Sequence, residues 1–134
     1  VSGGFGKNGP LAFTQIYDTD AQKWSAGPDL PTPLHHIFLV GRQDSILAIG
    51  GYEAYQKDLW VMKKEVYVLD KKQSSWLPGP DLPEPRAEFA AGNVDGTIIV
   101  AGGRKKKPKR QAGVTIIPML QRHFYLNGLQ ITGR

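Results

Sequence analysis

The chain is 134 residues long, with 40% hydrophobic and 22% charged residues, a composition typical of a globular protein rather than a disordered tail. No apolar run approaches the roughly 18 residues that a membrane-spanning helix requires, so we expect no membrane partner. The chain has no cysteine, which excludes a disulfide framework and a cysteine-based zinc site. The same absence fits a reducing compartment, and we therefore expect a cytoplasmic protein.

The net charge of +5 comes from one short basic run. Without that run, 11 positive residues stand against 12 negative ones, so the rest of the chain is nearly neutral. Short basic runs serve as nuclear import signals or acidic-partner contacts, but many are only solvated loops. The run therefore adds the nucleus as an alternative location. Its positive residues are Arg104, Lys105, Lys106, Lys107, Lys109 and Arg110.

Residues 1–28 match the end of a structural unit. Residues 1–4 have the pattern of a buried strand's end followed by a glycine pair. Residues 12–17 and 23–25 are expected to be two further strands. Short strands with frequent turn residues are typical of an all-β protein.

Residues 29–80 are expected to form one complete unit of four strands. Residues 34–40 and 45–49 are two apolar runs on either side of a polar turn, and Gly50 and Gly51 follow the second run. A longer polar connection comes next. Residues 64–69 alternate with period two, as a half-buried strand does, and Trp76 opens a short final strand.

Residues 81–104 begin the next unit. Asp95-Gly96 separates residues 86–94 from the apolar run 97–101. An Asp-Gly pair between two strands predicts a tight hairpin, because glycine tolerates the positive φ of a type I′ turn. The continuous apolar run is typical of a strand buried on both faces.

Residues 105–134 hold the basic loop and a divergent tail. Residues 122–126, followed by Asn127-Gly128, are a candidate third strand for the last unit. An alternative is that residues 111–134, which break the pattern, are not part of the repeat at all.

The strongest signal is a repeat with a period of 52 residues. GPDLPTP at residues 27–33 returns as GPDLPEP at residues 79–85. Proline lacks the N–H that a central strand needs, so this phrase predicts a rigid connector with one buried leucine, Leu30 or Leu82. A period of about 50 residues is typical of repeat architectures, including propellers. Four further pairs share the offset: Asp18 and Asp70, Trp24 and Trp76, Ile46 and Ile98, and Gly50-Gly51 and Gly102-Gly103.

This arrangement resembles the kelch repeat over about residues 1–104. The resemblance rests on a strand ending in Gly-Gly, a variable loop, a strand ending in Asp, and Trp six residues later. It implies an all-β, partial kelch-type propeller of four-stranded antiparallel blades, with Trp24 and Trp76 packing between blades. The arginine of the family matches Arg86, whereas the equivalent position in the first copy is Leu34.

The chain holds about 2.5 blades, whereas propellers have 4–8. We expect a fragment of a longer propeller, and the alternative is that several copies associate to close a ring.

Other polar residues favour structural roles. His35 and His36 are adjacent on a predicted strand and would point to opposite faces, so we expect no metal site. Asp18 and Asp70 occupy turn positions, where aspartate accepts bonds from nearby backbone N–H groups. No aromatic residue interleaves with the basic run, which disfavours nucleic-acid stacking.

The resemblance implies a non-catalytic protein-binding module without cofactors, as a substrate-recognition adaptor or a scaffold, with partner contacts on the loops of one face. The alternative is a fragment of a propeller enzyme, an oxidoreductase or isomerase, whose catalytic residues lie outside this segment. Exposed aromatic and basic side chains are typical binding anchors, although Tyr52 and Tyr55 could equally pack the loop. The candidate contacts are Tyr52, Glu53, Tyr55, Lys57, Arg104, Lys105, Lys106, Lys107, Lys109 and Arg110.

Overall fold

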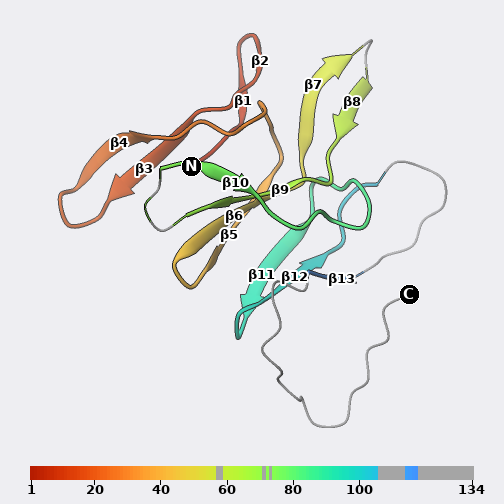
Figure 1. The fold of residues 1–134 in the computed structure, drawn as a ribbon. Helices are drawn as coiled ribbons and strands as arrows, with labels where there is room; N and C mark the ends of the chain where they lie inside the picture. The colour runs from red at the N-terminus through yellow and green to blue at the C-terminus, as the bar shows by residue number, and fades with distance from the viewer. Residues whose placement is uncertain (57–58, 71, 73, 106–113, 118–134) are drawn as a thin grey trace.

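The computed structural model describes residues 1–56, 59–70, 72, 74–105 and 114–117. Every regular element in these residues is a β-strand, and every described pair of strands is antiparallel. The predicted all-β class is therefore confirmed. The sheets follow one another as the blades of a partial, unclosed propeller (Figure 1).

The central blade is a four-stranded sheet in the order β10-β9-β6-β5. Strand β6 lies inside the sheet because its apolar side chains are covered on both faces, with Leu47 and Ile49 on one face and Ala48 on the other. The strands are β5 (Phe38–Arg42), β6 (Ser45–Ile49), β9 (Val66–Leu69) and β10 (Trp76–Pro78).

A partial blade lies on each side of the central one. The first is the pair β3 (Thr14–Asp18) and β4 (Lys23–Gly27). The last is the sheet β11 (Ala90–Val94), β12 (Thr97–Ala101) and β13 (Val114–Ile117). Its third described strand is therefore β13, and the candidate strand at residues 122–126 lies outside the described residues.

The predicted hairpin turn is present between β11 and β12. Asp95 and Gly96 have φ angles of 48° and 82°, so both central residues adopt the positive φ that a type I′ turn requires.

Two hairpins project from the blades, where the sequence predicted only a polar connection after Gly51. Strand β7 (Tyr52–Gln56) pairs with β8 (Leu59–Met62), with an irregular register between Glu53 and Gln56. The aromatic and β-branched residues of this segment favour strands. A shorter hairpin, β1 (Phe5–Gly6) with β2 (Gly9–Pro10), occupies the same place in the first blade, and β2 contacts β7 (Figure 1).

The 52-residue repeat holds at the level of backbone hydrogen bonds. The amide of Leu34 donates to Leu11 O over 3.1 Å, and the amide of Arg86 donates to Lys63 O over 3.0 Å. His36 and Glu88 share an unusual left-handed conformation, with φ angles of 52° and 55°. The two copies therefore fold alike even where their side chains differ.

The Pro-rich connectors carry the chain from one blade to the next. Leu30 and Leu82 are both buried, as the repeated phrase predicts. The amide of Leu30 donates to Ala12 O over 2.8 Å, and that of Leu82 donates to Lys64 O over 2.7 Å. Each connector is therefore anchored by a buried leucine whose own amide is hydrogen-bonded to the preceding part of the chain.

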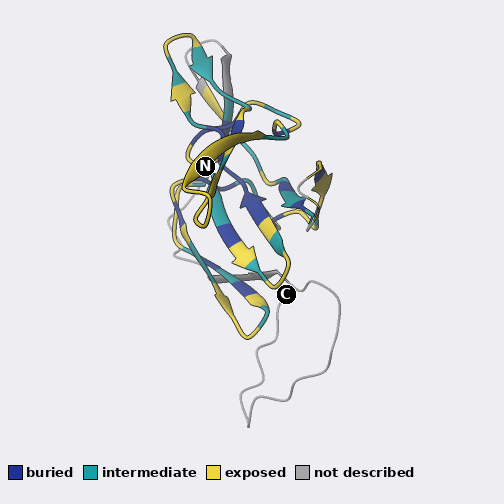
Figure 2. Ribbon diagram, turned by 90° about the vertical axis from the view of Figure 1, so that its left-hand side faces the viewer, coloured by how far each residue is buried: buried dark blue, intermediate teal, exposed yellow. Residues whose placement is uncertain are grey.

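Two hydrophobic clusters hold the central blade to its neighbours. Figure 2 shows the buried segments in the middle of the molecule and exposed positions at the hairpin tips. Burial of this kind contributes about 25 cal/mol per Å² of apolar surface. The cluster toward the last blade contains Val40, Leu47, Ile49, Val66, Leu82, Phe89, Ile98 and Val100. The cluster toward the first blade contains Leu30, Leu34, Ala48, Leu69 and Trp76.

Candidate functional site

Equivalent residues of three blades meet at one end of the molecule, here called the loop end. Phe5, Tyr52 and Arg104 each directly follow a glycine pair. Antiparallel bridges join Tyr52 to His35 and Arg104 to Ala87. The loop end is therefore built twice by the same backbone pairing, with different side chains displayed each time.

A continuous chain of side-chain contacts crosses the loop end. The Phe5 and His35 ring centroids are 5.1 Å apart, and those of His35 and Tyr52 are 5.3 Å apart. The Tyr52 hydroxyl donates to Glu88 Oε1 over 3.4 Å, and the Arg104 guanidinium Nε lies 2.8 Å from Glu88 Oε2. The side chains thus connect the first blade to the last.

The two histidines meet, contrary to the expectation that they would point to opposite faces. Strand β5 begins only at Phe38, and the left-handed conformation of His36 turns the backbone before that strand. Nδ1 of His35 lies 2.5 Å from Nδ1 of His36. Burial and the neighbouring His36 lower the pKa of His35 below its ordinary value.

An exposed aromatic pair lies on the same surface. Phe5 is 58% exposed and Trp60 is 43% exposed, and their ring centroids are 5.5 Å apart in an edge-to-face arrangement. The two residues come from hairpins of successive blades, β1–β2 and β7–β8. Neither residue was predicted as a contact from the sequence, although Phe5 follows a glycine pair as Tyr52 does, and that shared position was a usable signal.

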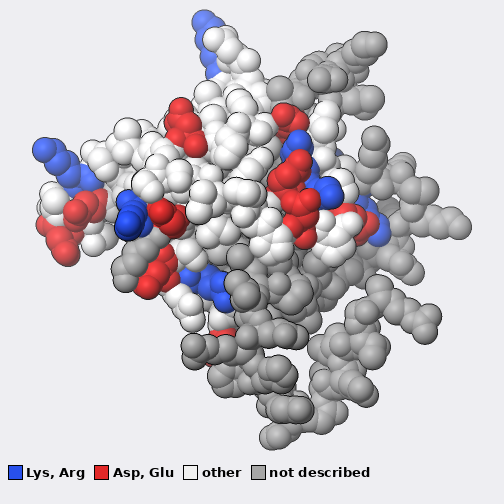
Figure 3. All heavy atoms as spheres, in the orientation of Figure 1, with Lys and Arg blue, Asp and Glu red and all other residues white. Residues whose placement is uncertain are grey.

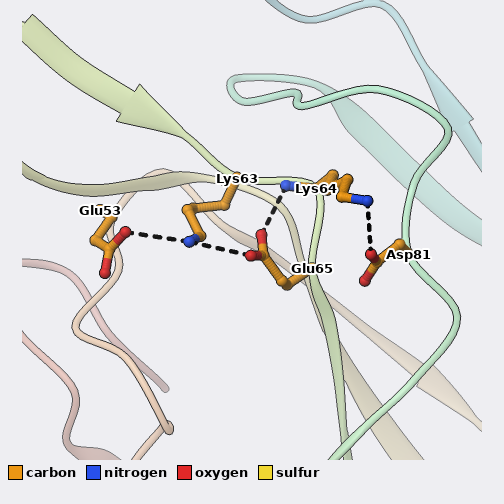
Figure 4. Close-up of polar contacts among 5 residues, drawn as sticks. All are labelled: Glu53, Lys63, Lys64, Glu65 and Asp81. Carbon is orange, nitrogen blue, oxygen red and sulfur yellow. Dashed lines mark hydrogen bonds and ion pairs between the residues drawn. The ribbon is translucent and has the colours of Figure 1, made fainter.

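Glu53 belongs to a network of ion pairs beside the loop end (Figure 4). Lys63 Nζ lies 3.1 Å from Glu53 Oε2 and 3.0 Å from Glu65 Oε1. Burial alone would lower the pKa of Lys63, but the hydrogen bonds to Glu65 and Glu53 outweigh it and raise that pKa. Lys64 Nζ pairs separately with Asp81 Oδ2 at 3.1 Å. Glu53 is thus engaged within the chain.

The remaining candidate contacts are placed as follows. Tyr52 is buried, with its hydroxyl on Glu88, and burial together with Glu88 raises its pKa. Arg104 is exposed and pairs with Glu88, and Lys105 Nζ lies 3.5 Å from Glu84 Oε1. Tyr55 lies in β7, but its side chain is outside the described part of the structure. Lys57, Lys106, Lys107, Lys109 and Arg110 also lie outside the described residues.

Outside the basic run, positively and negatively charged side chains are intermixed on the surface. On the face drawn in Figure 3, acidic and basic groups alternate and the space between them is uncharged. This agrees with the nearly zero net charge of the chain when its basic run is left out.

The repeated aspartates cap turns. Asp18 Oδ1 accepts hydrogen bonds from the amides of Asp20 and Ala21, both over 2.9 Å. Asp70 Oδ1 accepts one from the amide of Ser74 over 3.1 Å. In both repeats the carboxylate satisfies backbone donors of the turn that follows the third strand.

Arg86 is buried between the second Pro-rich connector and the glycine pair Gly102-Gly103. Its Nη1 donates to Gly102 O over 2.5 Å, and its Nη2 pairs with Glu84. The guanidinium therefore connects the Pro-rich connector to the second glycine pair, a contact that Leu34 cannot make in the first copy.

Arg86→Leu, which installs the residue of the first copy, should lower the free energy of unfolding by about 1.5–3 kcal/mol, because the hydrogen bond from the charged guanidinium to Gly102 O is lost. Urea unfolding followed by circular dichroism measures the change. Lys64→Leu serves as the control, since its exposed ion pair should contribute less than about 1 kcal/mol. Equal stability of Arg86→Leu and the original chain would show that an apolar side chain suffices there.

Among the residues that the structure describes, no group of three or more His, Cys, Asp or Glu side chains is placed to hold a metal ion. No helix in that same part of the chain is long and apolar enough to cross a membrane.

Comparison with known proteins gives several relatives but no matching family model. Kelch-like protein 41b of Danio rerio is 33% identical over 96 residues, or 72% of this chain. Kelch-like protein 40 of Homo sapiens is 33% identical over 94 residues, or 68% of the chain. Kelch domain-containing protein 8B of Rattus norvegicus is 24% identical over 124 residues, or 86% of the chain. The matches span only 15% of each kelch-like relative and 34% of the third protein.

Proposed function

Because the chain belongs to the kelch-repeat family, we propose that its loop end binds a partner protein without catalysing a reaction. The observation that carries this proposal is the exposed pair Phe5 and Trp60, which hairpins of two successive blades bring together. Aromatic side chains are enriched among the residues that dominate binding energy at protein interfaces. A substrate-recognition adaptor or a scaffold is the role we propose for the protein that contains this module.

The support beneath the aromatic pair strengthens the proposal. Trp60 contacts His35 with ring centroids 4.5 Å apart, and Tyr52 with centroids 6.3 Å apart. Tyr52 is buried, so its contribution is to hold the exposed rings rather than to touch a partner. A supported ring loses less conformational freedom on binding than a free one, which favours affinity.

The double variant Phe5→Ser/Trp60→Ser should weaken partner binding at least about 10-fold, because each aromatic anchor contributes upward of 1 kcal/mol. Proteins retained on the immobilised chain from a cell extract are quantified by mass spectrometry. The strongest candidate is then purified, and its affinity for both forms is measured by calorimetry.

The matched control is Leu77→Ser/Val94→Ser, which removes two exposed apolar side chains away from the loop end, on β10 and at the end of β11. We expect this control to bind as the original chain does. Equal binding by all three forms, or an equal loss in both double variants, would contradict the proposal, provided that circular dichroism shows all three folded.

A further inference from the structure

His35 contacts four other aromatic side chains at the loop end. Its ring lies 4.5 Å from Trp60, 4.7 Å from His36, 5.1 Å from Phe5 and 5.3 Å from Tyr52, centroid to centroid. It is 3% exposed, and its Nε2 is buried without a hydrogen-bond partner among the described residues. The direct contact between Phe5 and Trp60 of the two hairpins therefore packs on an imidazole whose Nε2 has no partner among the described residues.

The contact between the two histidines fixes how many protons the pair can hold. A hydrogen bond between two Nδ1 atoms needs a proton on one nitrogen and a lone pair on the other. If both rings are charged, both Nδ1 atoms carry protons, so the bond is lost and two cations face each other. The compact arrangement therefore requires at least one neutral imidazole.

We propose that the His35–His36 pair is a proton-sensitive latch, which holds the two hairpins together at neutral pH and releases them when His35 takes up a proton. A charged His35 would carry a proton on its buried Nε2, for which the described residues offer no acceptor. Burying an unpaired charge is strongly unfavourable, so the ring must move toward water. Phe5 and Trp60 would then lose the ring on which both of them pack.

The charged and titratable groups around His35 set the direction of the switch. Burial and His36 lower the pKa of His35, and Glu88 opposes them. Glu88 is already engaged with Tyr52 and Arg104, which limits its ability to stabilise an imidazolium. Because the pKa is lowered in the folded chain, the unfolded chain binds the proton more readily. The latch is therefore complete above about pH 6.5, the ordinary histidine value, and weakens as the pH falls below it.

The inference rests on the proposed function for its meaning, because the latch would regulate the surface that we propose binds a partner. Its test needs no partner and reads the geometry of the loop end directly. If the Phe5–Trp60 contact proves insensitive to pH, the latch is refuted and the binding proposal is unaffected. If the loop end binds no partner, the binding proposal is refuted and the latch is unaffected.

The test is a nuclear magnetic resonance titration of the 134-residue chain from pH 7.5 to pH 5.0. The ring protons of His35 report its charge, and cross-relaxation between Phe5 and Trp60 reports their contact. We expect His35 to titrate below pH 6.5 and the Phe5–Trp60 cross-peaks to disappear with the same midpoint. The indole of Trp76, buried in the cluster toward the first blade, should not shift and serves as the check that the chain stays folded.

Three variants separate the latch from other sources of pH dependence. His35→Phe keeps an aromatic ring and should make the Phe5–Trp60 contact independent of pH. His36→Asn removes the neighbouring charge at a position where asparagine tolerates a positive φ, and should move the midpoint to higher pH. His123→Gln replaces the remaining histidine of the sequence and is the control: the pH dependence of the Phe5–Trp60 contact should persist in this variant, and its loss would count against His35.

Two results would overturn the proposal. One is a protonated His35 with the Phe5–Trp60 contact intact, which would mean that the surrounding rings hold the imidazolium. The other is a loss of contact at a midpoint that does not match the titration of His35. Both come from the original chain, so the proposal can be refuted even if His35→Phe fails to fold.

Discussion

Trp76→Ala should lower the free energy of unfolding by about 3–5 kcal/mol, whereas Trp24→Ala should change it by less than about 0.5 kcal/mol. The two tryptophans are equivalent in the repeat, but Trp76 is 6% exposed and Trp24 is 57% exposed. The difference comes from what lies against each indole.

Trp76 joins the central blade to the first one. Its Nε1 donates to Pro28 O over 3.0 Å and lies 3.3 Å from Thr14 Oγ1, and its ring belongs to the cluster toward the first blade. Trp24 contacts Tyr17 on its own blade, with centroids 5.0 Å apart, and no other blade covers it among the described residues. The loss of stability on replacing each tryptophan by alanine therefore depends on whether a neighbouring blade covers the indole, and not on the strand that carries it.

Urea unfolding followed by circular dichroism measures both variants without relying on tryptophan fluorescence. Thr14→Val adds a partial test that keeps the shape of the side chain. It removes one of the two acceptors near the indole and also the hydrogen-bond partner of the buried Ser2 hydroxyl, so it should cost about 1–3 kcal/mol. Similar losses for Trp76→Ala and Trp24→Ala would show that local strand packing, not contact between blades, stabilises the chain.

The fold was predictable where the repeat and the strand pattern coincide. Residues 45–49 and 97–101 are β6 and β12 as predicted, because each is a short apolar run bounded by a turn and a glycine pair. The β7–β8 hairpin was not predicted, because it lies in a variable loop that the 52-residue repeat does not constrain. The hairpin of the first blade is also shorter, so the two copies could not be aligned there.

The site was harder to predict than the fold. Tyr52 was a candidate contact, yet it is buried, since the hairpin folds it against His35 and His36. Phe5 and Trp60 are 55 positions apart in the sequence, and their meeting depends on how adjacent hairpins lie. The histidine pair was misjudged because the strand rule applies only to extended backbone, and His36 is left-handed.

Gly51→Ala should destabilise the chain by about 2–5 kcal/mol, from backbone strain of about 1–2 kcal/mol and overpacking of about 1–3 kcal/mol. Gly51 has a φ of 94°, and a Cβ there would lie 2.5 Å from Ile37 Cγ2 and 2.7 Å from His35 O. Because His35 O accepts from the amide of Tyr52 over 2.8 Å, relief of this clash would also disturb the loop end.

Alanine substitutions at two other glycines distinguish the effect of backbone strain from that of steric crowding. Gly102→Ala meets a φ of 73° but no atom within 4 Å, and Gly92→Ala meets neither a positive φ nor a close atom. We expect Gly102→Ala to cost about 1–2 kcal/mol, and Gly92→Ala to be neutral or stabilising by up to about 1 kcal/mol. Urea midpoints then rank the three. If Gly51→Ala costs no more than Gly102→Ala, the close approach of His35 and Ile37 does not require a glycine at position 51, and backbone conformation alone accounts for it.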